Sequence, residues 1–413
     1  MDFMDFRRGV LAGGLIGDCY GYLYEKRKKI KLADVLNCIQ ESVSGDQRSQ
    51  IGYSDDTQMG WGLLKSLNSQ GKFNPEDVAR EFANNFLKDG RHRYYGGGVR
   101  KIFRSLAKDQ FKHPFKFAER QFKGTGSYGN GGAMRISPAA VYCMPMSENE
   151  FETFVVDVTR LTHTHPLGIC GALLQAFAVR HLWYNLSKMS APIDADSFLD
   201  GLLERLRKVQ YNYVDFGKPA WKGACDSYTE KFCQIKSLLA RTDSVPISEV
   251  AGLLGNNLEA VNSVPTAIYA FLRSLEPIAG IPFESVLLRC LAYTISLGGD
   301  TDTIGTMACS LAGGYCGFKD RTKMNDPSYS VPPLLLARCE GAEMISEYAE
   351  WTLPLRSPNA CGSVTTDADK TDSSQPLKDT VVQSGCKRTA QQEEESSVSD
   401  CKKTKREPAN NDQ

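Results

Sequence analysis

The stretch that most constrains the fold is GVLAGGLIGDCYG, residues 9–21, in which five glycines occur within a length typical of one helix. A second segment rich in small residues, TMACSLAGG, covers residues 306–314. Each glycine inside a soluble helix costs about 1 kcal/mol relative to alanine, so another interaction must offset it. A close crossing of two helices is one explanation, and the lining of a crowded polar centre is another. The two explanations are compatible.

Working outward from these segments, apolar residues follow a helical spacing through most of the chain. Alternating, β-branched strand patterns with hairpin turns are scarce. The sequence therefore predicts an all-α protein, a compact orthogonal bundle of about a dozen helices. The clearest helical runs are residues 78–87, 173–182, 198–209, 264–275 and 286–297.

The composition of the chain changes near Ser357. The 413-residue length would admit two or three domains, or one large helical domain. Beyond Ser357 there is no aromatic residue and much Ser, Thr, Asp, Gln and Lys, so too little apolar surface is available to offset chain entropy. We expect a folded domain over 1–356 and a disordered, low-complexity tail over 357–413.

Charge and cysteine usage exclude several classes of protein. Lys plus Arg and Asp plus Glu number 49 each, so the overall charge indicates neither nucleic acid nor a membrane as the main partner. Thirteen scattered cysteines include no CxxC pair, which favours reduced thiols over zinc or disulfide sites. The acidic N-terminus is typical of neither a secretory signal nor a mitochondrial presequence, and no apolar run approaches the ~18 residues of a membrane span.

Two acidic clusters precede helical segments. The first is YSDDT, residues 53–57, ahead of the run 59–67, and the second is GGDTDT, residues 298–303, ahead of 304–315. Ser, Thr and Asp are also common helix caps, so capping alone would explain either cluster. In the second, the alternating carboxylates of Asp300 and Asp302 can point into one pocket if the backbone there is extended.

Taken together, the clusters predict a metal centre. Their ligands are all oxygen atoms, which hard cations prefer, and no histidine follows His181 to suggest zinc. Four gathered carboxylates repel one another unless cations or protons neutralise them. We therefore expect Mg²⁺, as two ions.

A glycine-rich loop, GTGSYGNGG, covers residues 124–132 and contains a formal GxGxxG. It is a weak dinucleotide fingerprint, because residues 115–122 have a helical pattern and no βαβ unit surrounds them. A plain flexible loop is one interpretation. Backbone N–H groups that cradle a diphosphate are the other. Residues 94–98, YYGGG, and 161–165, LTHTH, are smaller signals of the same kind.

With these motifs assembled, the sequence from about Phe6 to Trp351 resembles the ADP-ribosyl-acceptor hydrolase (ADP-ribosylglycohydrolase) family. The resemblance is greatest to its serine-specific, poly(ADP-ribose)-degrading branch. The matching pieces, in order, are Gly17-Asp18 with Tyr24-Glu25, then SDDT (54–57), GSYGNGGAMR (126–135), SVPTAIY (263–269) and SLGGDTDT (296–303).

The resemblance implies an all-α fold around a two-magnesium centre, and it implies roles for particular residues. Ser54 departs from the threonine usual in the family but keeps the hydroxyl, and Thr125 replaces a lysine. The implied metal ligands are Ser54, Asp55, Asp56, Asp300, Asp302 and Thr303. The implied substrate-binding residues are Asp55, Gly96, Gly97, Gly98, Val99, Phe122, Gly126, Ser127, Tyr128, Gly129, Asn130, Gly131, His163 and Leu258.

Glu25 matches the acidic residue of the serine-specific branch, which implies that it is catalytic. The expected reaction is magnesium-dependent hydrolysis of the O-glycosidic bond between ADP-ribose and serine, and of poly(ADP-ribose), with Glu25 as general acid or base. Alternatives are an arginine-specific hydrolase, a non-catalytic ADP-ribose binding module, and a dimetal phosphohydrolase that attacks the diphosphate. The reaction product separates three of these classes. A hydrolase would release free ADP-ribose, a binding module would release nothing, and a phosphohydrolase would release AMP.

Partners and location follow as expectations. The partners would be ADP-ribosylated proteins and poly(ADP-ribose), with no sequence-specific nucleic acid, no membrane, and a monomeric state. Lys387-Arg388 and the basic run 402–406 are separated by thirteen residues, which is the layout of a bipartite nuclear-import signal or a solvated charge run. We expect the protein in the nucleus and cytoplasm.

Overall fold

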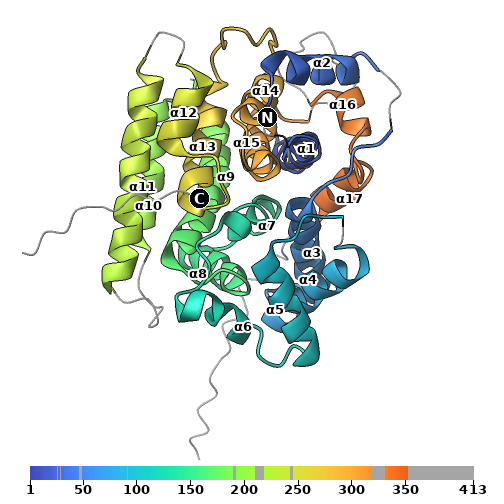
Figure 1. The fold of residues 1–413 in the computed structure, drawn as a ribbon, viewed down its shortest axis with the longest axis vertical. Helices are drawn as coiled ribbons and strands as arrows, with labels where there is room; N and C mark the ends of the chain where they lie inside the picture. The colour runs from blue at the N-terminus through green and yellow to red at the C-terminus, as the bar shows by residue number, and fades with distance from the viewer. Residues whose placement is uncertain are drawn as a thin grey trace, which may run out of the picture. The chain divides into compact units, whose positions relative to one another are not determined.

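The computed structural model describes residues 1–351 except Lys26, Lys28, 46–48, Arg91, 189–191, 210–217, 242–244 and 319–330. The described residues form seventeen α-helices, two 3₁₀ helices and three isolated β-bridges, with no strand among them (Figure 1). The all-α prediction is confirmed. The helices number more than a dozen because several span only one or two turns, too short to show an amphipathic period.

The first helices, α1 to α6, cover Phe3–Tyr22, Leu32–Val43, Asp55–Gln70, Pro75–Asp89, Gly97–Lys108 and Lys116–Glu119, followed by η1 (Gln121–Gly124) and η2 (Asn130–Gly132). Helices α7 to α12 cover Ile136–Tyr142, Glu148–Arg160, Pro166–Lys188, Ala195–Lys208, Lys218–Leu239 and Ile247–Leu254. Helices α13 to α17 cover Ala260–Arg273, Val286–Ser296, Thr301–Cys316, Pro333–Ala337 and Met344–Glu350.

The two helices rich in small residues, α1 and α15, cross at backbone contact. A Cβ atom added to Gly13 would lie 2.0 Å from the carbonyl oxygen of Cys309, and one added to Gly17 would lie 2.1 Å from that of Gly305. Figure 1 shows the pair side by side, with α14 against them. Close crossing therefore explains the glycines, because no larger side chain would fit between these backbones.

The long predicted helical runs all lie in helices, with ends displaced by a few residues. The run 264–275, for example, belongs to α13, which ends at Arg273. The helix predicted over 115–122 is wrong in part. The chain forms the short α6 and then turns through Phe122 and Lys123, whose φ angles are 49° and 60°. These left-handed conformations end the helix.

The described helices belong to one compact unit. No described helix is long and apolar enough to cross a membrane. Residues 357–413, with the predicted disorder and the import signal, lie outside the described residues. All ten cysteines in the described part are free.

Candidate active site

The first acidic cluster begins helix α3. The Ser54 side chain accepts a hydrogen bond from the N–H of Asp56 at 3.2 Å, so the capping interpretation is confirmed for this residue. The buried carboxylate of Asp18, on α1, accepts hydrogen bonds from the N–H groups of Ser54 (2.8 Å) and Thr57 (2.9 Å). Helix α1 thereby holds the chain that presents Asp55 and Asp56.

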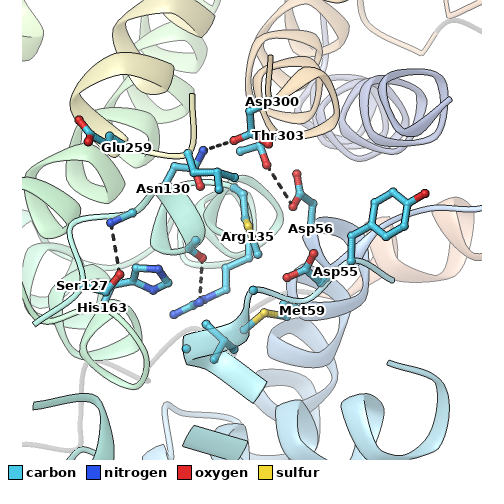
Figure 2. A pocket seen from close by; sticks show the side chains of 18 of the residues that line it. Asp55, Asp56, Met59, Ser127, Asn130, Arg135, His163, Glu259, Asp300 and Thr303 are labelled. Carbon is cyan, nitrogen blue, oxygen red and sulfur yellow. Dashed lines mark hydrogen bonds between the residues drawn. The ribbon is translucent and has the colours of Figure 1, made fainter. Parts of the chain in front are cut away.

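The second cluster begins helix α15. Asp300 is the N-cap residue, and Asp302 lies in the first turn, so the extended backbone that the sequence set as the condition for a shared pocket is not present. Both carboxylates nevertheless reach one pocket. The Asp300 Oδ2 atom accepts a hydrogen bond of 2.6 Å from Asn130 Nδ2. Thr303 Oγ1 donates to Asp56 Oδ1 at 3.4 Å, which joins the two clusters (Figure 2).

The gathered carboxylates lack neutralising partners. Asp56, Asp300 and Asp302 are only 2–5% exposed. In the described part of the chain, neither they nor Asp55 form an ion pair with Lys or Arg. Burial, and then neighbouring carboxylates, raise the pKa of Asp55, Asp56 and Asp302 well above the usual range.

The donor set fits a cation. Asp56 Oδ2 is buried without a hydrogen-bond partner among the described residues. Glu25, Asp300 and Asp302 each offer an oxygen atom, and these atoms lie within 4.8 Å of one another. Hard cations prefer such oxygen ligands, and a positive charge would relieve the carboxylate repulsion. The acidic cluster can therefore hold a metal ion.

The glycine loop is fixed by backbone pairing with the start of α13. Asn130 N–H donates to the carbonyl of Leu258 at 3.0 Å, and Ala260 N–H donates to that of Tyr128 at 3.1 Å. A Cβ atom on Gly131 would lie 2.4 Å from Cε1 of His163. Glycine is needed here because the imidazole ring packs directly on the loop.

A buried arginine supports this packing. Arg135 donates to the carbonyl oxygens of Gly131 (2.7 Å) and Val158 (2.9 Å), and to the hydroxyl of Thr162 (2.8 Å). Thr162 also contacts Nδ1 of His163 at 2.8 Å. Burial, and then the charge of Arg135, lower the pKa of His163 to about 3, so its ring is neutral at physiological pH.

The carboxylates and the glycine loop line one pocket of about 430 Å³, a volume in the range of small-molecule sites. Figure 2 shows Asp55 and Asp56 on α3, facing Asp300 and Thr303 on α15, with the loop residues Ser127 and Asn130 alongside. Phe122 and Tyr128 add an aromatic pair with ring centroids 5.6 Å apart, and their side chains are 56% and 37% exposed. The pocket thus combines an acidic centre with exposed aromatic rings.

Most of the residues singled out in the sequence line this pocket, whereas three do not. Ser54 is buried beneath it as the α3 cap, Gly97 begins α5, and Gly126 packs against Thr164 with φ of 80°. The lining residues predicted from the sequence are Glu25, Asp55, Asp56, Gly96, Gly98, Val99, Phe122, Ser127, Tyr128, Gly129, Asn130, Gly131, His163, Leu258, Asp300, Asp302 and Thr303.

Sequence reasoning missed other residues of the site. The Gly17-Asp18 motif indicates no role for Asp18, although its carboxylate holds the start of α3. Arg135 also belonged to a quoted motif, and a charge directly after a glycine loop is the signal that could have identified it. Tyr94 and Met134 likewise lie in quoted motifs, whereas Met59, Gln121 and Glu259 carry no distinctive local signal.

The fold and pocket define a class, an all-α protein with a carboxylate centre at a nucleotide-sized pocket. Residues 2–360 match the profile of the ADP-ribosylglycohydrolase family, and the chain belongs to that family. Its members hydrolyse glycosidic bonds, so the protein is a glycosidase-type hydrolase.

Relatives agree with this assignment. The chain is 39% identical to bovine "ADP-ribosylhydrolase ARH3" and 38% identical to the human protein, each over 345 residues that cover 81% of this chain and 89% of the relative. An "ADP-ribosyl-[dinitrogen reductase] glycohydrolase" from Rhodospirillum rubrum is 24% identical, over 76% of this chain and 86% of the relative. A solved "ADP-ribosylglycohydrolase-related protein complex" has a TM-score of 0.53 and 17% identity, covers 86% of this chain and 99% of that one, and shows the fold alone.

Proposed function

We propose that this protein is a magnesium-dependent ADP-ribosylhydrolase that releases ADP-ribose from serine on modified proteins and degrades poly(ADP-ribose). The observation that carries the proposal is the meeting of Glu25 and the carboxylates of the two acidic clusters with the glycine loop in one pocket. The carboxylates are Glu25, Asp55, Asp56, Asp300 and Asp302. The similarity to ADP-ribosylhydrolases over most of the chain supports the choice of substrate.

Each part of the pocket suits one part of ADP-ribose. The aromatic rings of Phe122 and Tyr128 are exposed for stacking on a base, and the glycine backbone permits close approach to a diphosphate. Neutral His163 is available as a hydrogen-bonding group rather than as a cation. The acidic end remains for the distal ribose, which bears the scissile bond.

Magnesium would be held by the residues of the two acidic clusters, Ser54, Asp55, Asp56, Asp300, Asp302 and Thr303. When bound, Mg²⁺ orients hydroxyl oxygens and lowers the pKa of a coordinated water. Asn130 orients the Asp300 carboxylate, and Asp18 orients the α3 start. The proposed number of ions is two, since four carboxylates carry more charge than one divalent cation balances.

Glu25 is the proposed proton donor or acceptor. Its carboxylate lines the pocket beside Asp300 and Asp302. From there it can move a proton to or from the attacking water or the leaving serine oxygen. The choice of serine over arginine depends on this residue, because a serine alkoxide is the poorer leaving group and gains more from protonation.

Product analysis tests the function. Peptides that carry ADP-ribose on serine or on arginine, and poly(ADP-ribose), are incubated with the protein and the products identified by mass spectrometry. We expect free ADP-ribose from the seryl peptide and the polymer, little from the arginyl peptide, and none in EDTA or with Asp302→Ala. Circular dichroism checks that Asp302→Ala remains helical. AMP release, no product at all, or full turnover in EDTA would each contradict the proposal.

We also propose that the protein is both nuclear and cytoplasmic, on the basis of the bipartite basic pattern at 387–388 and 402–406. Fluorescence microscopy of the full chain and of a chain ending at Arg356 measures this. Nuclear enrichment should fall when the tail is removed. An unchanged distribution would refute the import signal.

A further inference from the structure

A second groove borders the candidate pocket. It measures about 450 Å³ and lies between one face of α5 and the segment formed by α6 and η1. It shares Gly98, Gln121 and Phe122 with the candidate pocket, so the two are contiguous there. None of the carboxylates lines it. We call this region the flanking groove.

The flanking groove combines an apolar floor with a cationic rim. Ile102, 2% exposed, and the partly buried Phe117 contribute the apolar surface. Lys101 and Arg120 are exposed, and the guanidinium of Arg120 lies 6.0 Å from the centre of the Phe117 ring. An aromatic face beside cations is the combination that binds bases and phosphates of nucleotide chains.

The segment that forms the groove is strongly basic although the whole chain is neutral. Residues 97–125 contain eight Lys and Arg against two acidic residues. Those two are already engaged, Asp109 with His113 at 3.1 Å and Glu119 with Arg160 at 3.3 Å. Within the described residues, Lys101 and Arg120 have no carboxylate partner. The groove can therefore attract a polyanion.

We infer that the flanking groove binds the adjoining ADP-ribose unit when the candidate pocket holds an internal unit of poly(ADP-ribose). The inference rests on the proposed function. The shared residue Phe122 belongs to the aromatic pair proposed for adenosine, and the next unit of the polymer is attached through the adenosine ribose. A chain bound at this end would place its next base against Phe117 and its diphosphate near Lys101 and Arg120.

Binding measurements test the inference. Fluorescence anisotropy compares the affinities for monomeric ADP-ribose and for a two-unit ADP-ribose oligomer in the presence of Mg²⁺. The protein carries Glu25→Gln, so that the oligomer is not hydrolysed during the measurement. We expect the two-unit ligand to bind at least roughly fivefold more tightly at low salt, which is the size of two exposed charge contacts, and the gain to shrink at high salt to the part that stacking on Phe117 contributes. The double variant Lys101→Gln/Arg120→Gln should lose the salt-dependent part of the gain but keep its affinity for the monomer.

The matched control is Arg100→Gln/Lys108→Gln, which removes the same charges from exposed positions of α5 outside the groove. It should keep most of the gain. The inference is overturned if the two ligands bind equally, if both double variants lose the gain alike, or if single-stranded RNA of equal charge binds as tightly. Failure of the proposed function would give a different result. The wild type would release no ADP-ribose, while the two-unit oligomer would still bind more tightly than the monomer.

Discussion

Glu25 follows α1 and lies beside Asp300 and Asp302, so its side chain reaches the proposed reaction centre without belonging to either acidic cluster. Glu25→Gln keeps the shape of the side chain and removes proton transfer. We predict a loss of roughly 10²- to 10⁴-fold in kcat on seryl-ADP-ribose, with ADP-ribose binding retained. Single-turnover kinetics and calorimetry measure the two quantities. A fully active variant, or a preference for arginyl substrate, would contradict the assignment.

Asp18 positions the start of α3, the proposed metal-binding segment, without lining the pocket. Asn at this position keeps the volume but leaves one of the two backbone N–H groups without an acceptor. We predict that Asp18→Asn costs about 1–3 kcal/mol of stability and raises the Mg²⁺ concentration for half-maximal activity. Urea unfolding and a Mg²⁺ titration of activity check both effects.

Asp2→Asn is the control for this change, because Asp2 accepts an equivalent backbone hydrogen bond from Asp5 at 2.7 Å on an exposed helix end. Asn caps helices as well as Asp, so the control should change neither quantity. A loss of stability in Asp18→Asn with an unaltered Mg²⁺ response would reduce Asp18 to a structural role.

At the scale of elements, the crossing of α1 and α15 supports both sides of the site. Helix α1 provides Asp18, and α15 begins with Asp300 and Asp302. The Thr301 hydroxyl also donates to the carbonyl of Gly21 at 2.8 Å, next to Tyr22 where α1 ends. A change in the distance between these helices therefore shifts the acidic clusters relative to each other.

We predict that Gly13→Ala destabilises the protein by about 3 kcal/mol or more, because the added methyl group would overlap the carbonyl of Cys309. Gly252→Ala is the control, since no atom lies within 4 Å of its Cβ position on α12. There the better helix propensity of alanine should stabilise by about 0.5–1 kcal/mol. Chemical denaturation measures both. If the two substitutions change the stability equally, α1 and α15 can move apart to accommodate the methyl group at little cost.

At the scale of the whole molecule, the buried carboxylates connect stability to pH. Their pKa values are raised in the folded protein, so without metal the folded state binds more protons than the unfolded chain above pH ~4. The metal-free protein should therefore lose stability as pH rises through this window. Mg²⁺ needs the ionised carboxylates and should restore that stability.

We predict that saturating Mg²⁺ raises Tm by roughly 3–6 °C at pH 8 and by much less at pH 5. Differential scanning calorimetry with and without Mg²⁺ measures the change. His163 has a pKa of about 3 in the folded protein, so it lowers the stability as the pH falls below about 6.5. This effect is the same with and without Mg²⁺ and cancels in the comparison. Asp302→Ala should show little response. An equal shift at the two pH values would contradict the carboxylate explanation.

The sequence by itself determined the helical class and the chemistry of the centre. Helical spacing is a local property, so runs such as 78–87 and 286–297 could be recognised without any knowledge of packing. The same holds for the oxygen-bearing side chains of the two acidic clusters. The family resemblance then joined these motifs and suggested Glu25, whose isolated position carries no local signal.

Only the tertiary structure decided which groups meet. The hydrogen bond between Asn130 and Asp300 joins residues 170 positions apart, and that between Thr303 and Asp56 joins residues 247 apart. Supporting groups such as Asp18, and the break in the chain at Phe122, were likewise invisible to local patterns. The physical reason is that periodicity reports which face of an element is buried, whereas a site depends on contacts between distant elements, which packing alone determines.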